Sequence, residues 1–138
     1  MAVAHAVGSA DAARVDAVNV LEATYDAMHA ALDGLGLGVD RVLVDGPRFR
    51  AYFSPDSRAW LPHRCVPGGD SAHLSVAAAS ILAKEHRDAF ARGRMHAEHP
   101  AYGFDVHKGY GTPAHLETLL RLGACPYHRV TFRGVPLW

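Results

Sequence analysis

Residues 41–46 decide the fold of this chain, and they read RVLVDG. The apolar run from Val42 to Val44 predicts a short buried strand, which ends at an acid followed by a glycine. Ligands of open α/β sheets bind outside the carboxyl ends of the strands, so Asp45 is the first candidate for chemistry. The alternative is an aspartate that only caps a turn with Gly46, and the strand by itself leaves both interpretations open.

A helix is expected before this strand. Apolar residues recur at steps of three and four from Val18 to Leu35, which is the stripe of an amphipathic helix. Ser9 or Asp11 is the expected N-cap, and the glycines that begin at Gly34 end the helix.

A second, longer helix is expected from Leu74 to about Met95, where Ala, Ile, Leu and Phe dominate and the first glycine is Gly93. Its small residues, which include Ala78 and Ala79, predict close packing on a sheet.

One face of this second helix carries Ser80, Lys84 and Asp88, which are spaced by four residues. Lys84 before Asp88 is the weaker orientation of such a pair, so helix stability is a poor reason for both charges. A merely solvated face and a functional face both remain open.

The other segments carry weaker signals. Residues 47–69 predict a loop, with one short strand near Arg64 to Val66, and a loop is also expected from residue 100 to residue 112. A short helix is expected from Pro113 to Leu122, because Thr112 and Pro113 are typical of a helix start and Gly123 of a helix end.

Composition limits the function classes. A length of 138 residues predicts one domain. The 14 Lys and Arg residues balance 14 Asp and Glu residues, so a contact with nucleic acid would need a local basic patch. No apolar run approaches the roughly 20 residues of a membrane span, and the N-terminus does not resemble a signal peptide. A cytoplasmic protein without a membrane partner is expected.

The two cysteines and ten histidines give no metal signature. Cys65 and Cys125 lie far apart without a CxxC motif, which indicates neither a disulfide framework nor a zinc ribbon. A zinc set made from them with His63 and His128 lacks closely spaced pairs. The histidines are therefore interpreted as surface and packing residues.

The strongest signal comes from several segments taken together. They are LVDG (43–46), GGDSAHLSVAAASILAKEHRD (68–88), and HKGYGTPAH (107–115) followed by GACPYHRVTF (123–132). In this order and spacing they closely resemble the ribonuclease HII family, and residues 15–32 are similar to the family's first long helix. The resemblance is continuous from about Val7 to Phe132.

This resemblance implies a ribonuclease H-like α/β fold. It also implies a monomeric endonuclease of DNA replication and repair, which hydrolyses the RNA strand of RNA–DNA hybrids and cuts at ribonucleotides embedded in a DNA duplex. The family uses two divalent ions, Mg²⁺ or Mn²⁺, which clustered carboxylates hold about 3.5–4 Å apart. Asp45 and Asp88 match family carboxylates, so the resemblance implies that both are catalytic metal ligands.

The resemblance also implies a set of substrate contacts. Tyr110 matches the tyrosine of the family's HKGYGT signature, which packs against the sugar at the junction between a ribonucleotide and a deoxyribonucleotide. A flat ring that packs on a deoxyribose can reject a sugar with an extra 2′-OH, and that hydroxyl is what distinguishes RNA from DNA. The local basic patch and its neighbours would be Lys84, Arg87, His107, Lys108, Gly109 and Arg129, with help from His128.

The 138 residues depart from the family pattern in one major way. The family's catalytic centre begins with a strand that ends in a DExGRG motif, which these residues do not contain. The first match, Val3 to Gly8, is with the family's third strand, so residues 1–138 are expected to form a partial catalytic domain without the first two strands. Gly68 and His73 also replace a lysine and a serine of the family.

Two carboxylates hold two hard cations poorly, so the chain is expected to be inactive alone. An unpaired strand edge and open apolar surface also lead us to expect aggregation. Two alternatives remain open. One is a short paralogue that binds hybrid or duplex nucleic acid without cutting it, and the other is a gene remnant that does not fold stably.

Overall fold

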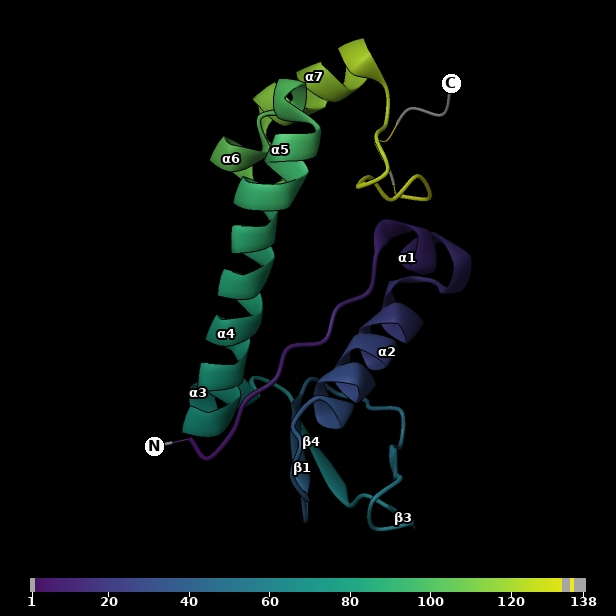
Figure 1. The fold of residues 1–138 in the computed structure, drawn as a ribbon, viewed down its shortest axis with the longest axis vertical. Helices are drawn as coiled ribbons and strands as arrows, with labels where there is room; N and C mark the ends of the chain where they lie inside the picture. The colour runs from purple at the N-terminus through teal and green to yellow at the C-terminus, as the bar shows by residue number, and fades with distance from the viewer. Residues whose placement is uncertain (1, 133–134, 136–138) are drawn as a thin grey trace. The chain divides into compact units, whose positions relative to one another are not determined.

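The computed structural model describes residues 2–132 and Val135, and it has the expected α/β composition of helices with small sheets (Figure 1). The chain divides into two compact units. Unit 1 consists of Met1–Ser9 and Thr24–Lys84, and unit 2 consists of Ala10–Ala23 and Glu85–Trp138. Among the described residues, no helix is both long and apolar enough to cross a lipid bilayer.

The main sheet of unit 1 confirms both predicted strands. Strand β1 (Val42–Asp45) pairs in parallel with β4 (His63–Val66), and Asp45 lies opposite Val66. Within the described residues β1 pairs with β4 alone. The prediction of a buried strand is therefore only half right, since Val44 is 5% exposed but Leu43 is 37% exposed.

A small hairpin lies inside the stretch that was expected to be a loop. Strands β2 (Phe53–Ser54) and β3 (Ala59–Trp60) pair in an antiparallel manner, and the rings of Phe53 and Trp60 meet edge to face at 5.4 Å. Strands of two residues are too short to produce a periodic pattern, which is why the sequence does not predict them.

The first helix is interrupted, which corrects the prediction of one continuous helix. Helix α1 (Ala12–Val18) is followed by α2 (Val20–Asp33), and Asn19 between them has a φ of 74°. The Asn19 side chain accepts a hydrogen bond from the Leu21 N–H at 2.9 Å and so caps α2. The N-cap at Asp11 is confirmed, because its carboxylate accepts the Arg14 N–H at 2.7 Å, and α2 ends just before Gly34 as predicted.

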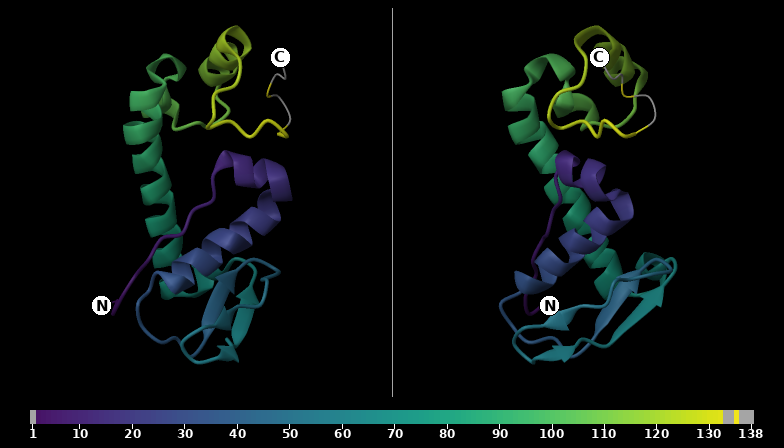
Figure 2. Two further views of the ribbon diagram at one scale, coloured as in Figure 1. Left: turned by 45° about the vertical axis from the view of Figure 1, so that its right-hand side comes forward. Right: turned by 90° about the vertical axis from the view of Figure 1, so that its right-hand side faces the viewer.

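Unit 1 packs the later part of α2 against the segment that follows β1, as two views in Figure 2 show. The Phe49 ring lies edge to face with His29 at 5.5 Å, and Arg50 pairs with Asp26 at 2.5 Å. Tyr52 donates a hydrogen bond to Asp33 at the end of the same helix. These contacts fix α2 beside the strand that carries Asp45.

Residues 3–8 form an extended segment, not the strand that the family match implies. A strand needs a hydrogen-bonded neighbour, and this segment instead packs on α2 through Gly8. A Cβ atom at Gly8 would lie 2.0 Å from the carbonyl oxygen of Ala27 and 2.7 Å from the N atom of Ala31. Only glycine fits this close approach of two backbones.

The second long helix begins where predicted and extends further. Helix α3 (Gly69–Ala72) precedes α4 (Leu74–Phe90), which continues through a π-helical turn (Ala91–Met95) into α5 (His96–Glu98). Ala78, Ala79 and Ala83 are exposed, so the prediction that these small residues pack on a sheet is wrong within the described residues. The helix signal itself was local and correct.

Unit 2 is a helical assembly around an aromatic core. A 3₁₀ helix (Pro100–Tyr102) and α6 (Phe104–His107) occupy the stretch predicted to be a loop. Helix α7 (Pro113–Leu122) is confirmed with its predicted caps, since the Thr112 hydroxyl accepts the His115 N–H at 3.3 Å and Gly123 ends the helix. The buried core comprises Ala91, Met95, Tyr102, Phe104, Leu119 and Cys125.

Candidate functional site

Asp45 lies at the carboxyl end of β1 in unit 1, the position expected from the strand pattern. Asp45 is exposed, and one of its carboxylate oxygens accepts the Gly69 N–H at 2.9 Å. Gly46 continues the parallel pairing beyond it by donating its N–H to the Val66 carbonyl at 3.2 Å. The carboxylate is therefore held at the sheet edge by a fixed backbone donor, so its orientation is set before any ligand binds.

Gly69 is the first residue of α3 and lies close to the strands. A Cβ atom at this position would make ordinary van der Waals contacts, at 3.4 Å from Val76 Cγ1 and 3.5 Å from Val66 Cβ. The preceding residue, Gly68, has a φ of 68°, in the left-handed region that favours glycine. The Gly-Gly pair thus turns the chain sharply from β4 into α3 and presents an N–H to Asp45.

In unit 2, Asp88 forms a small cluster with three residues of the motifs quoted above. The Asp88 side chain is 11% exposed, and Arg87 Nη1 approaches its carboxylate at 3.2 Å. The same guanidinium lies over the Tyr110 ring at 4.7 Å from its centre. A Cβ atom at Gly109 would lie 3.3 Å from Arg87 Nη2, so the backbone there closely approaches the cation. The structure therefore brings together Arg87, Asp88, Gly109 and Tyr110.

Arg129 adds a second cation to unit 2. Burial, followed by the nearby positive charge of Arg87, lowers the pKa of the Arg129 guanidinium. That guanidinium lies 3.7 Å from the centre of the Phe132 ring, which orients it. Two like charges near each other favour an anion between or beside them.

The two lysines of the predicted patch lie in different units. Lys108 is half-buried in unit 2, where its ammonium donates to the Val106 carbonyl at 2.9 Å. Lys84 is exposed and is the last residue of unit 1 on α4. Asp45 likewise belongs to unit 1 and Asp88 to unit 2.

His107 lies in the interior of unit 2 at 9% exposure. Its Nδ1 accepts the Gly109 N–H at 3.0 Å, and its Nε2 lies 2.6 Å from the Tyr102 carbonyl oxygen. Its ring stacks on that of His115 at 4.2 Å with an angle of 16° between the planes. Both ring nitrogens of His107 therefore contact protein groups.

His115 and His128 continue this arrangement. His115 is 5% exposed, its Nδ1 lies 2.9 Å from the Tyr110 carbonyl oxygen, and its Nε2 lies 3.0 Å from His128 Nε2. The Cys125 N–H donates to His128 Nδ1 at 2.9 Å. Burial lowers the pKa of both imidazoles, and for His128 the nearby His115 lowers it further.

The implied metal ions require more ligands than either unit supplies. Carboxylate oxygens are the ligands that Mg²⁺ and Mn²⁺ prefer, and Asp45 and Asp88 are of that kind. Within the part of the chain that the structure describes, no three His, Cys, Asp or Glu side chains are arranged so that they could hold a metal ion. The residues present therefore do not form a complete two-metal site.

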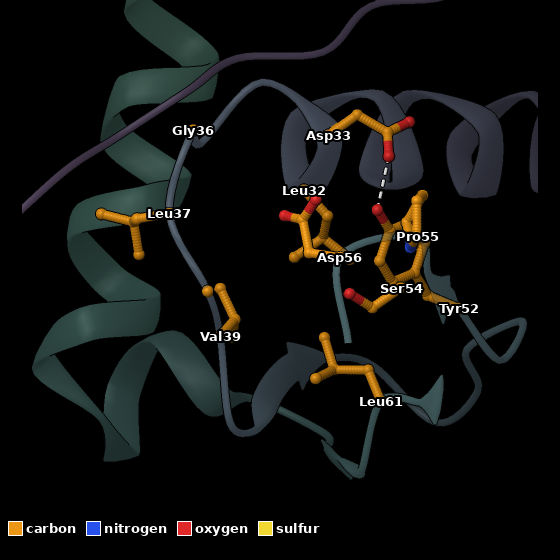
Figure 3. A pocket seen from close by; sticks show the side chains of 11 residues that line it. Leu32, Asp33, Gly36, Leu37, Val39, Tyr52, Ser54, Pro55, Asp56 and Leu61 are labelled. Atoms are coloured by element: carbon orange, nitrogen blue, oxygen red, sulfur yellow. Dashed lines mark hydrogen bonds between the residues drawn. The ribbon is translucent and has the colours of Figure 1, made fainter. Parts of the chain in front are cut away.

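A pocket in unit 1 is lined by none of the candidate site residues described above (Figure 3). Leu32 and Asp33 at the end of α2 line it, together with Tyr52, Asp56 and Leu61. The hydrogen bond to Asp33, with burial, raises the pKa of Tyr52 to about 12. The Asp33 carboxylate is thus engaged with Tyr52, and the pocket contains none of the predicted site residues.

Some contacts of this site had no signal in the sequence. The packing of Arg87 on Tyr110 joins residues 23 positions apart (110 minus 87), and no spacing rule predicts it. His115 is the last residue of the stretch HKGYGTPAH, and the pattern of that stretch gives it no role of its own. Its position in the first turn of a helix capped by Thr112 could have indicated that it faces the preceding loop.

Comparison with known proteins agrees with the motif pattern. A family model described as Ribonuclease HII matches residues 1–135. The chain is 42% identical over 129 residues to a ribonuclease HII of Porphyromonas gingivalis, an alignment that covers 94% of the chain and 61% of that relative. It is 46% identical over 129 residues to one of Chlamydia muridarum, with 94% and 55% covered.

A ribonuclease HII of Bacteroides thetaiotaomicron is 44% identical over 131 residues, which are 95% of the chain and 62% of that relative. The chain thus spans about half to three-fifths of the length of the curated relatives it matches. Since the family model covers nearly all of the chain, the chain belongs to the ribonuclease HII family.

Proposed function

We propose that this chain is part of a ribonuclease HII-type endonuclease. Its substrates would be RNA–DNA hybrids and DNA duplexes that contain single ribonucleotides, and its reaction the hydrolysis of a phosphodiester bond. The observation that carries the proposal is the cluster in unit 2, where a buried carboxylate, a cation and a half-exposed aromatic ring meet at Asp88, Arg87 and Tyr110. These are the groups needed beside a sugar–phosphate backbone.

Each group of the cluster would have a separate task. The exposed part of the Tyr110 ring would pack on a deoxyribose, and an added 2′-OH there would clash. Arg87 and Arg129 would contact phosphate oxygens, which set the register of the duplex. Gly109, without a side chain, would let the loop backbone come close to the strand.

The metal dependence belongs to the same proposal. Asp45 and Asp88 would be ligands of Mg²⁺ or Mn²⁺, and further carboxylates would come from the family's DExGRG segment. The strand that carries this segment would pair with the open edge of β1 in a ribonuclease H-like sheet. The 138 residues alone would therefore be inactive, although they would still contain the loop with Gly109 and Tyr110 that contacts the substrate.

The test is a cleavage assay on two proteins. One is the 138-residue chain, and the other is the same chain joined to a segment of a relative that carries the DExGRG motif, here called the joined protein. We expect cleavage of a DNA duplex with one ribonucleotide by the joined protein only, and only with Mg²⁺ or Mn²⁺ present. Cleavage by the 138-residue chain at enzyme-like rates would contradict the need for further carboxylates.

A second candidate function is binding without cleavage. The cations and the aromatic ring of unit 2 favour it, because they form a contact surface that needs no metal ion. A joined protein that binds the ribonucleotide duplex but leaves it uncut would favour this candidate. A chain that neither binds nor folds would favour the gene remnant.

A further inference from the structure

Three histidines of unit 2 form a continuous chain of contacts, which we call the histidine relay: His107, His115 and His128. The relay joins three separate parts of the chain, because His107 ends α6, His115 lies in the first turn of α7 and His128 lies in the segment after it. At its centre is the backbone of the loop that carries Tyr110.

The proton positions in the relay follow from its backbone partners. The Cys125 N–H donates to His128 Nδ1 at 2.9 Å, a shorter contact than the 3.3 Å between that nitrogen and the Cys125 carbonyl oxygen, so we assign no proton to Nδ1 and place the proton of the neutral ring on Nε2. His128 Nε2 then donates to His115 Nε2, which leaves the His115 proton on Nδ1, where it faces the Tyr110 carbonyl. By the same rule His107 carries its proton on Nε2, because its Nδ1 accepts the Gly109 N–H.

The relay holds the backbone of Tyr110 on both sides. The Tyr110 N–H donates to the His107 carbonyl at 2.9 Å, and the Tyr110 carbonyl accepts from the Thr112 N–H at 2.8 Å and from His115 Nδ1 at 2.9 Å. With both main-chain groups held, the ring can project outward, where it is 50% exposed beneath Arg87. The backbone that sets the direction of the ring is therefore bound by one buried imidazole, that of His115, while the His107 imidazole holds the adjacent Gly109 N–H.

We propose that His115 is a positioning residue for Tyr110, and that the relay orients the ring only while His115 and His128 are neutral. This rests on the proposed function, in which Tyr110 distinguishes a ribonucleotide from a deoxyribonucleotide. The consequence is a preference for ribonucleotide-containing duplexes that is lost as the solution becomes acidic. Nothing in the motif pattern alone assigns this role to His115.

The acid sensitivity has a structural cause. A proton added to His115 Nε2 would face the Nε2–H of His128, so two donors would meet at 3.0 Å. The titratable groups around the two rings include no carboxylate that could compensate an added positive charge: they are Tyr102 and Cys125 in the core, His99 after α5, and His107 on α6. Because burial lowers the pKa of His115 and His128 below the ordinary 6.5, the relay is intact at pH 6.5 and above and breaks as the pH falls through these lowered pKa values.

The experiment tests the two hydrogen bonds of the His115 ring separately: the one from Nδ1 to Tyr110 and the one at Nε2 with His128. In His115→Asn the amide nitrogen replaces Nδ1 and keeps the hydrogen bond to Tyr110, whereas in His115→Gln the longer side chain reaches His128 but loses Tyr110. His5→Gln, at an exposed histidine of unit 1, is the matched control. For each protein, fluorescence anisotropy at nanomolar concentration gives the Kd for a duplex with one ribonucleotide and for the same duplex made only of DNA, from pH 5 to pH 8.

The preference is the Kd for the all-DNA duplex divided by the Kd for the ribonucleotide duplex. We expect this ratio to be roughly three- to tenfold lower in His115→Gln than in the wild type at pH 7.5, which is the range that one hydrogen bond contributes, and the two proteins to converge as the pH falls. His115→Asn and His5→Gln should keep the wild-type ratio at pH 7.5. In the wild type, the ratio should fall with pH below 6.5. A His115→Gln protein that keeps the wild-type ratio and its pH profile would overturn the proposal.

Hydrogen exchange followed by mass spectrometry makes the result independent of substrate. The backbone amides of residues 108–112 should exchange faster in His115→Gln than in His115→Asn, after correction for intrinsic rates. If the wild type shows no preference for ribonucleotides but this difference in exchange is present, the proposed role of Tyr110 fails and the positioning by His115 stands. Equal exchange in the two variants would contradict the positioning role.

Discussion

At the scale of single residues, Asp16 has a structural position that separates it from the catalytic candidates. Its carboxylate accepts the N–H groups of Val130 and Thr131 at 2.9 and 3.0 Å and the Thr131 hydroxyl at 2.6 Å. These hydrogen bonds, led by that of the hydroxyl, lower the pKa of Asp16. Asp16 thus links α1 to the segment that holds Arg129, and it does not act as a free carboxylate.

The first prediction concerns this link. Asp16→Asn should increase hydrogen exchange at the amides of Val130 and Thr131, because a neutral amide is a weaker acceptor than a carboxylate. The lowered pKa means that the wild-type contribution is present above the ordinary value of 3.8 and is lost as the pH falls through the lower folded-state value. The wild type and the variant should therefore converge in strong acid. An unchanged exchange rate at pH 7 would contradict the link.

The second prediction concerns Asp45 in the joined protein. Asp45→Asn should reduce cleavage of the ribonucleotide duplex by about a hundredfold or more, since a charged metal ligand is lost. The matched control is Asp40→Asn, at an exposed aspartate just before β1. Steady-state cleavage rates measure both. Equal rates in Asp45→Asn and Asp40→Asn would show that Asp45 only orders the turn with Gly69.

At the scale of elements, the sequence predicted those helices and strands whose signals are local. Helix α7 was predicted because Thr112, Pro113 and Gly123 mark its ends, and β1 because its apolar run stops at Asp45. The break at Asn19 was missed, since an apolar stripe continues across it while the asparagine caps the next helix. Helix α6 and the β2–β3 hairpin were too short for a periodic signal.

In the candidate site, too, only the residues with a local sequence signal could be predicted. Asp45, Asp88 and Tyr110 could be proposed from motifs, because each lies in a stretch with a recognisable order of residues. The contact between Arg87 and Tyr110 and the histidine relay depend on how helices fold back on one another. Such contacts are set by tertiary packing, which one sequence without structure does not specify.

The third prediction belongs to the contact between the first segment and α2. Gly8→Ala should destabilise this packing by about 1–3 kcal/mol, because the new methyl group would overlap the Ala27 carbonyl. Gly38→Ala is the matched control, since a Cβ atom there meets nothing within 4 Å. Hydrogen exchange of the α2 amides measures the difference. Equal protection of α2 in both variants would show that the first segment does not pack as described.

At the scale of the whole molecule, large apolar side chains remain in water. Leu74 is 89% exposed, Val106 72%, Leu120 64% and Ile81 62%. Full burial of one such side chain contributes roughly 1.5–3 kcal/mol to the free energy of unfolding. Burying a few of them therefore contributes an amount comparable with the whole stability of a domain. Leu74 and Ile81 both lie on α4 in unit 1, where the open edge of β1 also lies.

The fourth prediction follows from this exposure. At tens of micromolar, the 138-residue chain should self-associate, bind a hydrophobic dye and melt without a single cooperative transition, while the joined protein should bind less dye. Light scattering, dye fluorescence and circular dichroism measure these properties. A sharp, reversible melt of a monomer would contradict the prediction, favour the non-cleaving paralogue and support the prediction that residues 1–138 fold as one domain.

The chain passes between the two units three times, after Ser9, Ala23 and Lys84. The second and third passages fall inside α2 and α4, not in linkers. A protein cut after Lys84 would therefore contain residues 10–23 without the rest of unit 2, and one starting at Glu85 would lack Asp16, which holds residues 130 and 131. No single truncation yields either unit whole, so their separate stabilities can be measured only on rearranged chains, such as circular permutants, and not on halves.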